Sequence, residues 1–168
     1  IFEALLRVDP DGWHDAVINL QGDLPTVDPS SLRSVTALLS CSAVDIGTLA
    51  AVISDTEECR NPNVVKAEVA ISPGEYSGRA LNFTRSDVPI NAHSFYHHIG
   101  IYAYRRSAIT QFVTLNPTIS ELKEGLEQLR ALEAGMRIDV ALCESIPFGV
   151  DTEEDLELVR ALLAENKE

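Results

Sequence analysis

The chain has 168 residues, of which 45% are hydrophobic, and its 13 basic and 26 acidic side chains leave a formal net charge of −13. This composition predicts one soluble globular domain, or one domain with a small appendage. It argues against a disordered chain and a disulfide-stapled miniprotein, and no apolar run approaches the ~20 residues of a membrane span. The charge repels nucleic-acid phosphates and anionic membrane surfaces, and no basic stripe offsets it, so we expect neither as a partner.

The first segment of the chain predicts a helix, a buried strand and a second helix. Residues 1–8 carry apolar side chains at a helical period, and because the pattern is already running at residue 1, we expect further residues upstream. Residues 16–20 form a short apolar run typical of a buried strand. A polar loop then leads to Asp28-Pro29, an acceptor followed by proline, which predicts a helix over 30–39.

The rest of the chain alternates between strand and helix patterns. Strands are expected over residues 47–54, 64–71, 79–84, 96–104 and 136–143, and helical segments over 56–60, 107–114, 118–134 and 152–164. Thr118 and Glu121 have the spacing of a capping box. The alternation predicts an α/β sheet, and the turn between 64–71 and 79–84 predicts some antiparallel pairing within it.

The three cysteines, Cys41, Cys59 and Cys143, lie far apart in the chain and form no C-x-x-C pair. Their spacing predicts isolated thiols in a reducing cytoplasm rather than a disulfide framework or a zinc site.

Two aspartates stand where a metal ion could bind. Asp23 follows the strand 16–20 in a loop, and ligands of open α/β sheets bind just beyond the carboxyl ends of strands. Asp151 stands at the entrance of the last helix. Each has a structural alternative, because a turn aspartate can accept backbone N–H groups and a helix N-cap favours aspartate. Mg²⁺ needs only one or two protein carboxylates when substrate phosphates supply the other ligands, so the pair is more suggestive than either residue alone.

The strand over 96–104 carries two adjacent histidines. Side-chain alternation places His98 on one face with Tyr102 and Tyr104, and the apolar residues between them on the other. His97 and His98 therefore point to opposite faces, which argues against a shared zinc site. A histidine with a purely structural role is the alternative for His98.

Three further polar residues have ordinary alternatives. Arg85 ends the strand 79–84, where its guanidinium could grip a carboxylate bidentately or simply lie on the surface. On the helix 118–134 a leucine stripe leaves Glu127 and Gln128 at its flanks, where periodicity alone predicts solvated side chains. The chain has no phosphate-binding P-loop, dinucleotide fingerprint, nucleophile elbow or H-E-x-x-H motif. The residues alone thus predict an acidic α/β domain with a candidate metal and anion site.

Five separated motifs, spread in order through essentially the whole chain, resemble the 3-deoxy-manno-octulosonate cytidylyltransferases, also called CMP-Kdo synthetases. The motifs are residues 17–23 (VINLQGD), 61–66 (NPNVVK), 98–104 (HIGIYAY), 126–130 (LEQLR) and 149–156 (GVDTEEDL). For the fold, the resemblance implies a mixed, mostly parallel sheet of the nucleotide-diphospho-sugar transferase type, Rossmann-like with three α/β/α layers and an antiparallel insertion.

The resemblance also implies an activity and its site. The activity is transfer of CMP from CTP to 3-deoxy-D-manno-octulosonate (Kdo) with release of pyrophosphate, in the cytoplasm, for lipopolysaccharide synthesis. By resemblance, Asp23 and Asp151 are the catalytic pair that holds Mg²⁺. The residues that match the sugar-acid pocket are Gln21, Arg85, His98, Tyr102, Glu127 and Gln128, with Arg85 as the partner of the Kdo carboxylate.

The chain departs from the family pattern at two places. Leu24 stands where the family has glutamate in Gln-Gly-Asp-Glu-Pro, so no role of that glutamate carries over. We also expect residues 1–168 to be a single cytidylyltransferase domain that lacks the family's N-terminal glycine-rich phosphate loop and first strand. The resemblance suggests a homodimer with part of 79–104 at the interface. The competing hypotheses are a cytidylyltransferase for sialic acid or amino-Kdo, and a catalytically inactive α/β module for binding or dimerisation.

Overall fold

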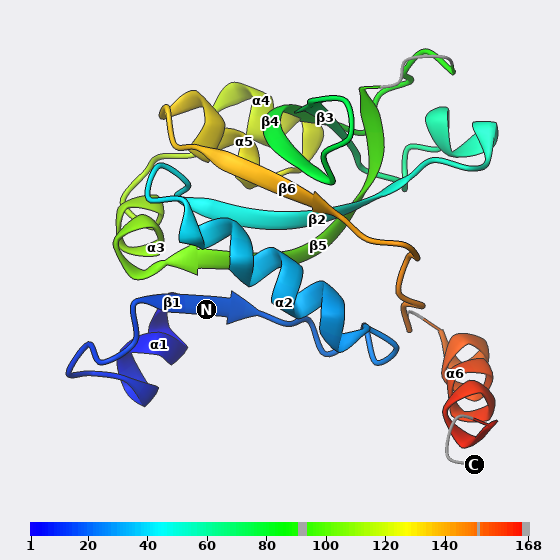
Figure 1. The fold of residues 1–168 in the computed structure, drawn as a ribbon, viewed down its shortest axis with the longest axis horizontal. Coiled ribbons are helices and arrows are strands. Elements are labelled where there is room, and N and C mark those ends of the chain that lie inside the picture. The colour runs from blue at the N-terminus through cyan, green and yellow to red at the C-terminus, as the bar shows by residue number, and fades with distance from the viewer. Residues whose placement is uncertain (91–93, 151, 166–168) are drawn as a thin grey trace.

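The computed structural model of the chain describes residues 1–90, 94–150 and 152–165, which form a sheet with helices on both faces (Figure 1). In chain order the elements are α1 (Phe2–Val8), β1 (Ala16–Asn19), α2 (Pro29–Ala37), the 3₁₀ turn η1 (Leu38–Ser40), β2 (Ile46–Val52), the 3₁₀ turn η2 (Thr56–Cys59), β3 (Lys66–Ile71), β4 (Ser77–Thr84), β5 (Phe95–Arg105), α3 (Arg106–Phe112), α4 (Ile119–Glu124), α5 (Gln128–Glu133), β6 (Ile138–Leu142) and α6 (Glu153–Glu165). The predicted elements therefore occur in the predicted order, except that the helix expected over 118–134 is divided into α4 and α5.

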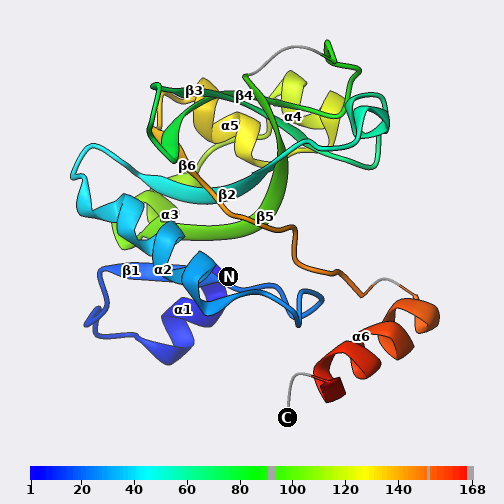
Figure 2. The ribbon, with the colours of Figure 1, turned by 45° about the vertical axis from the view of Figure 1, so that its right-hand side comes forward.

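The described strands are ordered β1-β5-β2-β6-β4-β3, and the sheet is mixed. Only β2 and β6 pair in parallel, whereas the other five pairings are antiparallel, so the expectation of a mostly parallel sheet is wrong for these strands. The physical reason is β5, a long curved strand that pairs antiparallel with β1, β2 and β3, together with the β3–β4 hairpin (Figure 2). Alternation of strand and helix patterns in a sequence does not reveal these directions.

Two apolar cores lie on the two faces of the sheet. Alternation along β2 directs Ile46 and Ala50 to one core, with side chains from α3 and α5, and Leu49 and Ala51 to the other, with Val35 of α2. The three-layer arrangement follows from this alternation. The view in Figure 1 shows α2 in front of the sheet, and both ribbon views show α6 apart from it.

The segment predicted as one helix over 118–134 is two short helices. Thr118 and Glu121 form the predicted capping box at the start of α4, and Gly125 ends α4 with φ 66°, a left-handed conformation that favours glycine. The break shifts the helical phase, so Leu122 is 74% exposed, while Leu126 and Leu129 are buried. The prediction that Leu122 belongs to a buried leucine stripe with Leu126 and Leu129 is therefore wrong.

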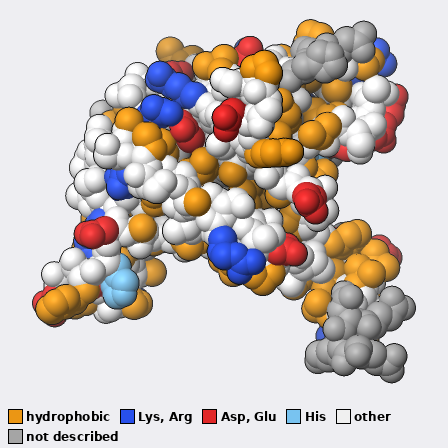
Figure 3. Space-filling model, viewed as in Figure 1, with side chains coloured by type: hydrophobic (Ala, Val, Ile, Leu, Met, Phe, Trp, Pro, Cys, Tyr) orange, Lys and Arg blue, Asp and Glu red, His pale blue; other side chains and the backbone are white. Residues whose placement is uncertain are grey.

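The surface shown in Figure 3 carries basic side chains scattered between acidic and hydrophobic ones. Among the described residues, no helix combines the length and apolar character that crossing a bilayer requires.

Gly78 lies in the β3–β4 hairpin where no side chain fits. A Cβ atom at this position would overlap the carbonyl oxygen of Ala70 and lie 2.7 Å from its carbonyl carbon, so the backbone of β3 would have to move. We expect Gly78→Ala to destabilise the fold by about 3 kcal/mol in urea unfolding. The matched control is Gly22→Ala, because no atom lies within 4 Å of a Cβ there, and a change of less than about 1 kcal/mol is expected. Equal effects of the two substitutions would contradict the steric argument.

Candidate active site

A cavity of about 240 Å³ lies where β1 and β5 meet the turn between α4 and α5. Its lining residues are Ile1, Asn19, Gln21, Ile46, Tyr102, Tyr104, Phe112, Gly125, Glu127 and Gln128. Four of the eight predicted site residues, from three separated motifs, are among them. The fold thus brings together Gln21, Tyr102, Glu127 and Gln128, which the sequence keeps up to 107 positions apart, since 128 − 21 = 107.

Gln21 reaches the middle of β5. Its side-chain Nε2 donates a hydrogen bond of 2.9 Å to the carbonyl oxygen of Gly100. A Cβ atom on Gly100 would lie 3.2 Å from that Nε2, so glycine at this position leaves room for the amide. The contact fixes the Gln21 side chain at the cavity wall.

A row of rings follows one face of β5, as side-chain alternation predicts. The ring centroids of His98 and Tyr102 are 5.6 Å apart, and those of Tyr102 and Tyr104 are 5.7 Å apart. Phe83 of β4 meets His98 edge to face at 5.0 Å. His98 does not line the cavity itself, but its ring contacts that of Tyr102, which does, in a tilted arrangement.

His98 is 8% exposed, and its Nε2 lies 3.0 Å from the Thr48 hydroxyl oxygen. That hydroxyl can donate its one proton to the carbonyl oxygen of Ile101 at 2.9 Å, so it accepts from a His98 ring protonated on Nε2. Burial, assisted by the neighbouring His97, lowers the pKa of His98 to about 3. His98 is therefore a neutral ring at physiological pH, with a lone pair on Nδ1 that can accept a hydrogen bond.

Acid should destabilise the fold through His98. A histidine in the unfolded chain takes up a proton near its ordinary pKa of 6.5, whereas folded His98 does so only near pH 3. Between these two values the unfolded state binds more protons than the folded state, so the free energy of unfolding falls as the pH drops. We expect a loss of about 2 kcal/mol between pH 7 and pH 5, measured by urea unfolding. His98→Gln has no ring to titrate and should show a shallower pH dependence. Parallel curves for the two proteins would contradict the prediction.

The turn between α4 and α5 presents Glu127 and Gln128 to the cavity in different ways. Gln128 is buried, although helical periodicity predicted a solvated side chain, and the break at Gly125 is the reason. The Glu127 side chain is exposed, as predicted. Arg130 anchors the turn, because its guanidinium lies 4.7 Å above the ring of Phe112 and 3.0 Å from the carboxylate of Glu121.

Arg85 lies outside the cavity lining but is linked to it. Its backbone N–H donates a 2.7 Å hydrogen bond to the carboxylate of Glu124, which precedes the cavity residue Gly125. Its guanidinium donates to the carbonyl oxygens of Pro62 and Asn63, at 3.2 and 3.3 Å. Arg85 is therefore partly held by backbone groups, and it is not a freely solvated surface side chain.

Asp23 is exposed in the loop after β1. Its backbone carbonyl accepts the N–H of Val150 at 2.8 Å, so the segment that leads to the second predicted aspartate runs beside it. Asp151 itself lies outside the described residues. Leu24, at the position of the family's glutamate, packs against the core on the α2 face.

Asp23 is the described residue at this loop that could hold Mg²⁺. Asp23 supplies an exposed carboxylate oxygen, the ligand type that Mg²⁺ prefers, and within the described residues that carboxylate takes part in no ion pair. No group of three or more His, Cys, Asp or Glu side chains in the described part of the chain is placed to hold a metal.

Two polar cavity residues were missed by the sequence analysis. Asn19 precedes Gln21 by two positions, so strand alternation, extended two residues back from Gln21, would have found it. Tyr104 was placed on the correct face but given no role. Burial raises the pKa values of Tyr102 and Tyr104, so both hydroxyls stay protonated at neutral pH and can donate hydrogen bonds.

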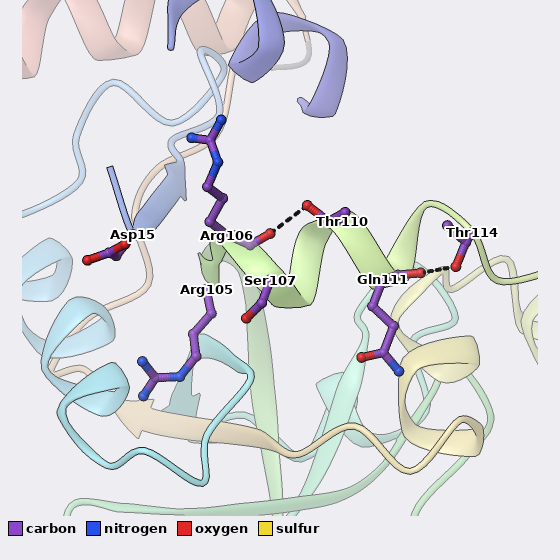
Figure 4. A pocket seen from close by; sticks show the side chains of 7 residues that line it. All are labelled: Asp15, Arg105, Arg106, Ser107, Thr110, Gln111 and Thr114. Carbon is purple, nitrogen blue, oxygen red and sulfur yellow. Dashed lines mark hydrogen bonds between the residues drawn. The ribbon is translucent and has the colours of Figure 1, made fainter. Parts of the chain in front are cut away.

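A larger cavity of about 800 Å³ lies at the junction of β5 and α3, and its side chains do not converge (Figure 4). Arg105 donates to the carbonyl oxygens of Val44 and Cys41 at 2.7 Å. Arg106 points the other way and forms an ion pair with Asp9. Both guanidinium groups are thus engaged by the protein, and the smaller cavity remains the candidate site.

Comparison with known proteins shows the family of the chain. The family model described as Cytidylyltransferase matches residues 1–138. The chain belongs to the cytidylyltransferase family. It is 55% identical over 163 residues to the 3-deoxy-manno-octulosonate cytidylyltransferase of Paramagnetospirillum magneticum (strain ATCC 700264 / AMB-1), covering 97% of this chain and 66% of the relative. The corresponding protein of Rhodospirillum centenum (strain ATCC 51521 / SW) is 56% identical, with 97% and 63% covered.

A solved structure of CMP:2-keto-3-deoxy-manno-octonic acid synthetase, complexed with CTP, superposes on this cytidylyltransferase chain with a TM-score of 0.82 and 33% identity, covering 98% of this chain and 68% of the other. An apo UDP-glucose pyrophosphorylase superposes with a TM-score of 0.66 at 14% identity, covering 99% and 60%, which concerns the fold alone. The fold is therefore the nucleotide-diphospho-sugar transferase fold. The chain spans just under two thirds of the length of the two curated relatives above.

Proposed function

We propose that this cytidylyltransferase chain, in a polypeptide of its relatives' length, transfers CMP from CTP to Kdo and releases pyrophosphate, supplying the activated sugar for lipopolysaccharide. The observation that carries the proposal is the cavity between β1, β5 and the α4–α5 turn, which gathers polar residues of three family motifs. The names of relatives at 55% and 56% identity support the choice of substrate.

The cavity is the sugar-acid site in this proposal. Gln21, Tyr102, Glu127 and Gln128 offer amide, hydroxyl and carboxylate groups for the hydroxyls of the sugar, and the neutral ring of His98 supports Tyr102. Arg85 is the partner of the sugar carboxylate, because a guanidinium binds a carboxylate with two parallel hydrogen bonds.

The reaction is an in-line displacement at the α-phosphorus of CTP. The anomeric hydroxyl oxygen of the sugar forms the new bond to phosphorus, the bond to the pyrophosphate oxygen breaks, and the hydroxyl proton is released. Asp23 and Asp151 are the residues that would hold Mg²⁺. When bound, that ion would neutralise phosphate charge and lower the pKa of the attacking hydroxyl. The chain's own side chains contribute the orientation of the sugar against the nucleotide.

The domain, location and assembly belong to the same proposal. Residues 1–168 act as a single cytidylyltransferase domain, and the part of the relatives outside the matched region supplies the triphosphate loop. Free thiols at Cys41, Cys59 and Cys143 fit the reducing cytoplasm. The chain forms a homodimer, and exposed Leu81 and Ile90 in segment 79–104 are candidates for its interface. A monomeric mass in light scattering would reject the dimer.

The decisive experiment measures pyrophosphate release from CTP and Mg²⁺ by the full-length protein, with Kdo and sialic acid offered separately. Release with Kdo alone is the expected result. Release with sialic acid alone would keep the reaction and change the substrate. No release with either sugar would favour the inactive binding module.

A further inference from the structure

The backbone of Arg85 is held at its N–H and at its carbonyl group by two charged side chains. The carboxylate of Glu124 accepts the Arg85 N–H at 2.7 Å and the Thr84 hydroxyl at 3.0 Å. The ammonium group of Lys66 donates a 3.0 Å hydrogen bond to the Arg85 carbonyl oxygen. We call these two contacts, from Lys66 and from Glu124, the Arg85 clasp.

Lys66 is an unusual residue to find in this place. It belongs to β3, is 0% exposed, and donates a second 3.0 Å hydrogen bond to the carbonyl oxygen of Asn61. Burial lowers the pKa of its ammonium group, with Asp87 opposing the shift. Burying a charge costs free energy that a well-packed apolar side chain would avoid. Unlike an apolar side chain, the lysine donates hydrogen bonds to two backbone carbonyl groups.

The two carbonyl groups that Lys66 contacts, those of Asn61 and Arg85, lie close along the chain to the groups that hold the Arg85 guanidinium. That guanidinium donates to the carbonyl oxygens of Pro62 and Asn63, directly after Asn61. Lys66 therefore ties the loop 61–63 to the backbone of Arg85, and the position of the guanidinium depends on both. On the other side, Glu124 is the last residue of α4 and precedes the cavity wall at Gly125.

We propose that Lys66 and Glu124 are positioning residues that hold Arg85 in register with the sugar-acid cavity. The inference rests on the proposed function, in which Arg85 binds the sugar carboxylate. Lys66 and Glu124 touch no substrate and act through Arg85 alone. Their loss should therefore weaken the use of the sugar acid and leave the nucleotide unaffected.

The first test is steady-state kinetics of the full-length Lys66→Met and Glu124→Ala proteins. Each should raise KM for Kdo about tenfold, the size of a lost charge-assisted contact, and change KM for CTP and kcat less than about twofold. Glu124→Gln keeps an oxygen acceptor for the Arg85 N–H and should recover most of the loss. The matched control is Lys123→Met, which removes an exposed lysine beside Glu124 and should leave all constants unchanged.

The second test separates positioning from a general loss of stability. In an Arg85→Ala background, adding Lys66→Met should change KM for Kdo less than about twofold, because the residue it acts through is gone. The proposal would be overturned if the KM increases of the two single substitutions multiplied in the double variant. It would also be overturned if the Lys66 or Glu124 variants raised KM for Kdo and KM for CTP equally. If Lys66→Met does not fold, Glu124→Ala with Arg85→Ala forms the same cycle.

Amide hydrogen exchange at Arg85 needs no substrate and keeps the two proposals distinguishable. The exchange rate of this amide should rise at least about tenfold in Glu124→Ala, since its hydrogen bond is removed. If the wild-type protein released no pyrophosphate with Kdo, the proposed function would be wrong. The exchange rate of the Arg85 amide would still test whether Glu124 holds the Arg85 backbone. An unchanged rate would overturn the clasp while leaving the function standing.

Discussion

Asp23→Asn should lower kcat for pyrophosphate release by about a hundredfold or more and leave the fold intact. The amide keeps the size and polarity of the side chain but loses the negative charge that a hard cation requires, and a metal ion contributes several kcal/mol to such a transition state. Asp23 is exposed, and its contact to the neighbouring segment runs through its backbone carbonyl, so the substitution disturbs little packing. The measurement is initial-rate kinetics at saturating CTP, Kdo and Mg²⁺, with urea unfolding for stability.

A matched control for this substitution lies five residues further along the chain. The Asp28 side chain accepts the N–H of Ser30 as the N-cap of α2, and asparagine caps helices about as well as aspartate, so Asp28→Asn should retain near-normal turnover. Asp151→Asn should lose as much activity as Asp23→Asn. Near-normal turnover of Asp23→Asn would reject its metal role.

Arg85→Ala should raise KM for Kdo by about 30-fold and KM for CTP by less than about threefold. A bidentate bond to a carboxylate is a charge-assisted interaction of about 1.5–3 kcal/mol, which corresponds to roughly 10- to 100-fold in affinity. Arg85→Lys keeps the charge but not the planar fork, so an intermediate KM is expected. Steady-state kinetics with each substrate varied in turn gives both constants.

The control for Arg85→Ala is Arg79→Ala, because Arg79 is an exposed arginine on the same strand, β4. This variant should keep both KM values close to those of the wild type. Equal rises in the two constants for Arg85→Ala would show that the arginine supports the whole domain rather than the sugar acid, and the assignment of its role would then be wrong.

Local sequence patterns predicted most of the helices and strands and the side chains on one face of β5. The run of residues 16–20 became β1, and the capping box at Thr118 begins α4, as predicted. Alternation along β5 placed His98, Tyr102 and Tyr104 on one face, where their rings lie in a row. These predictions succeeded because each depends on backbone geometry within a few residues.

Burial at the α4–α5 turn and at β3 was not predictable in the same way. Gln128 is buried because Gly125 breaks the helix, and glycine within a helical pattern is compatible with either a break or a continuous helix. Lys66 is buried on β3, a strand that pairs with both β4 and β5, and its ammonium group contacts the carbonyl oxygens of Asn61 and Arg85. No local pattern in the sequence indicates that position.

The sequence by itself determined the order of the helices and strands, apart from the break at Gly125, the acidic character of the domain and, through five motifs, its family. Only the tertiary structure decided that the described sheet is mainly antiparallel, that Gln21, Tyr102, Glu127 and Gln128 share one cavity, and that the Arg85 peptide is held by two charged residues. The physical reason is distance along the chain. Periodicity and capping act over a few residues, whereas strand pairing and side-chain contacts join segments whose separation no local pattern encodes.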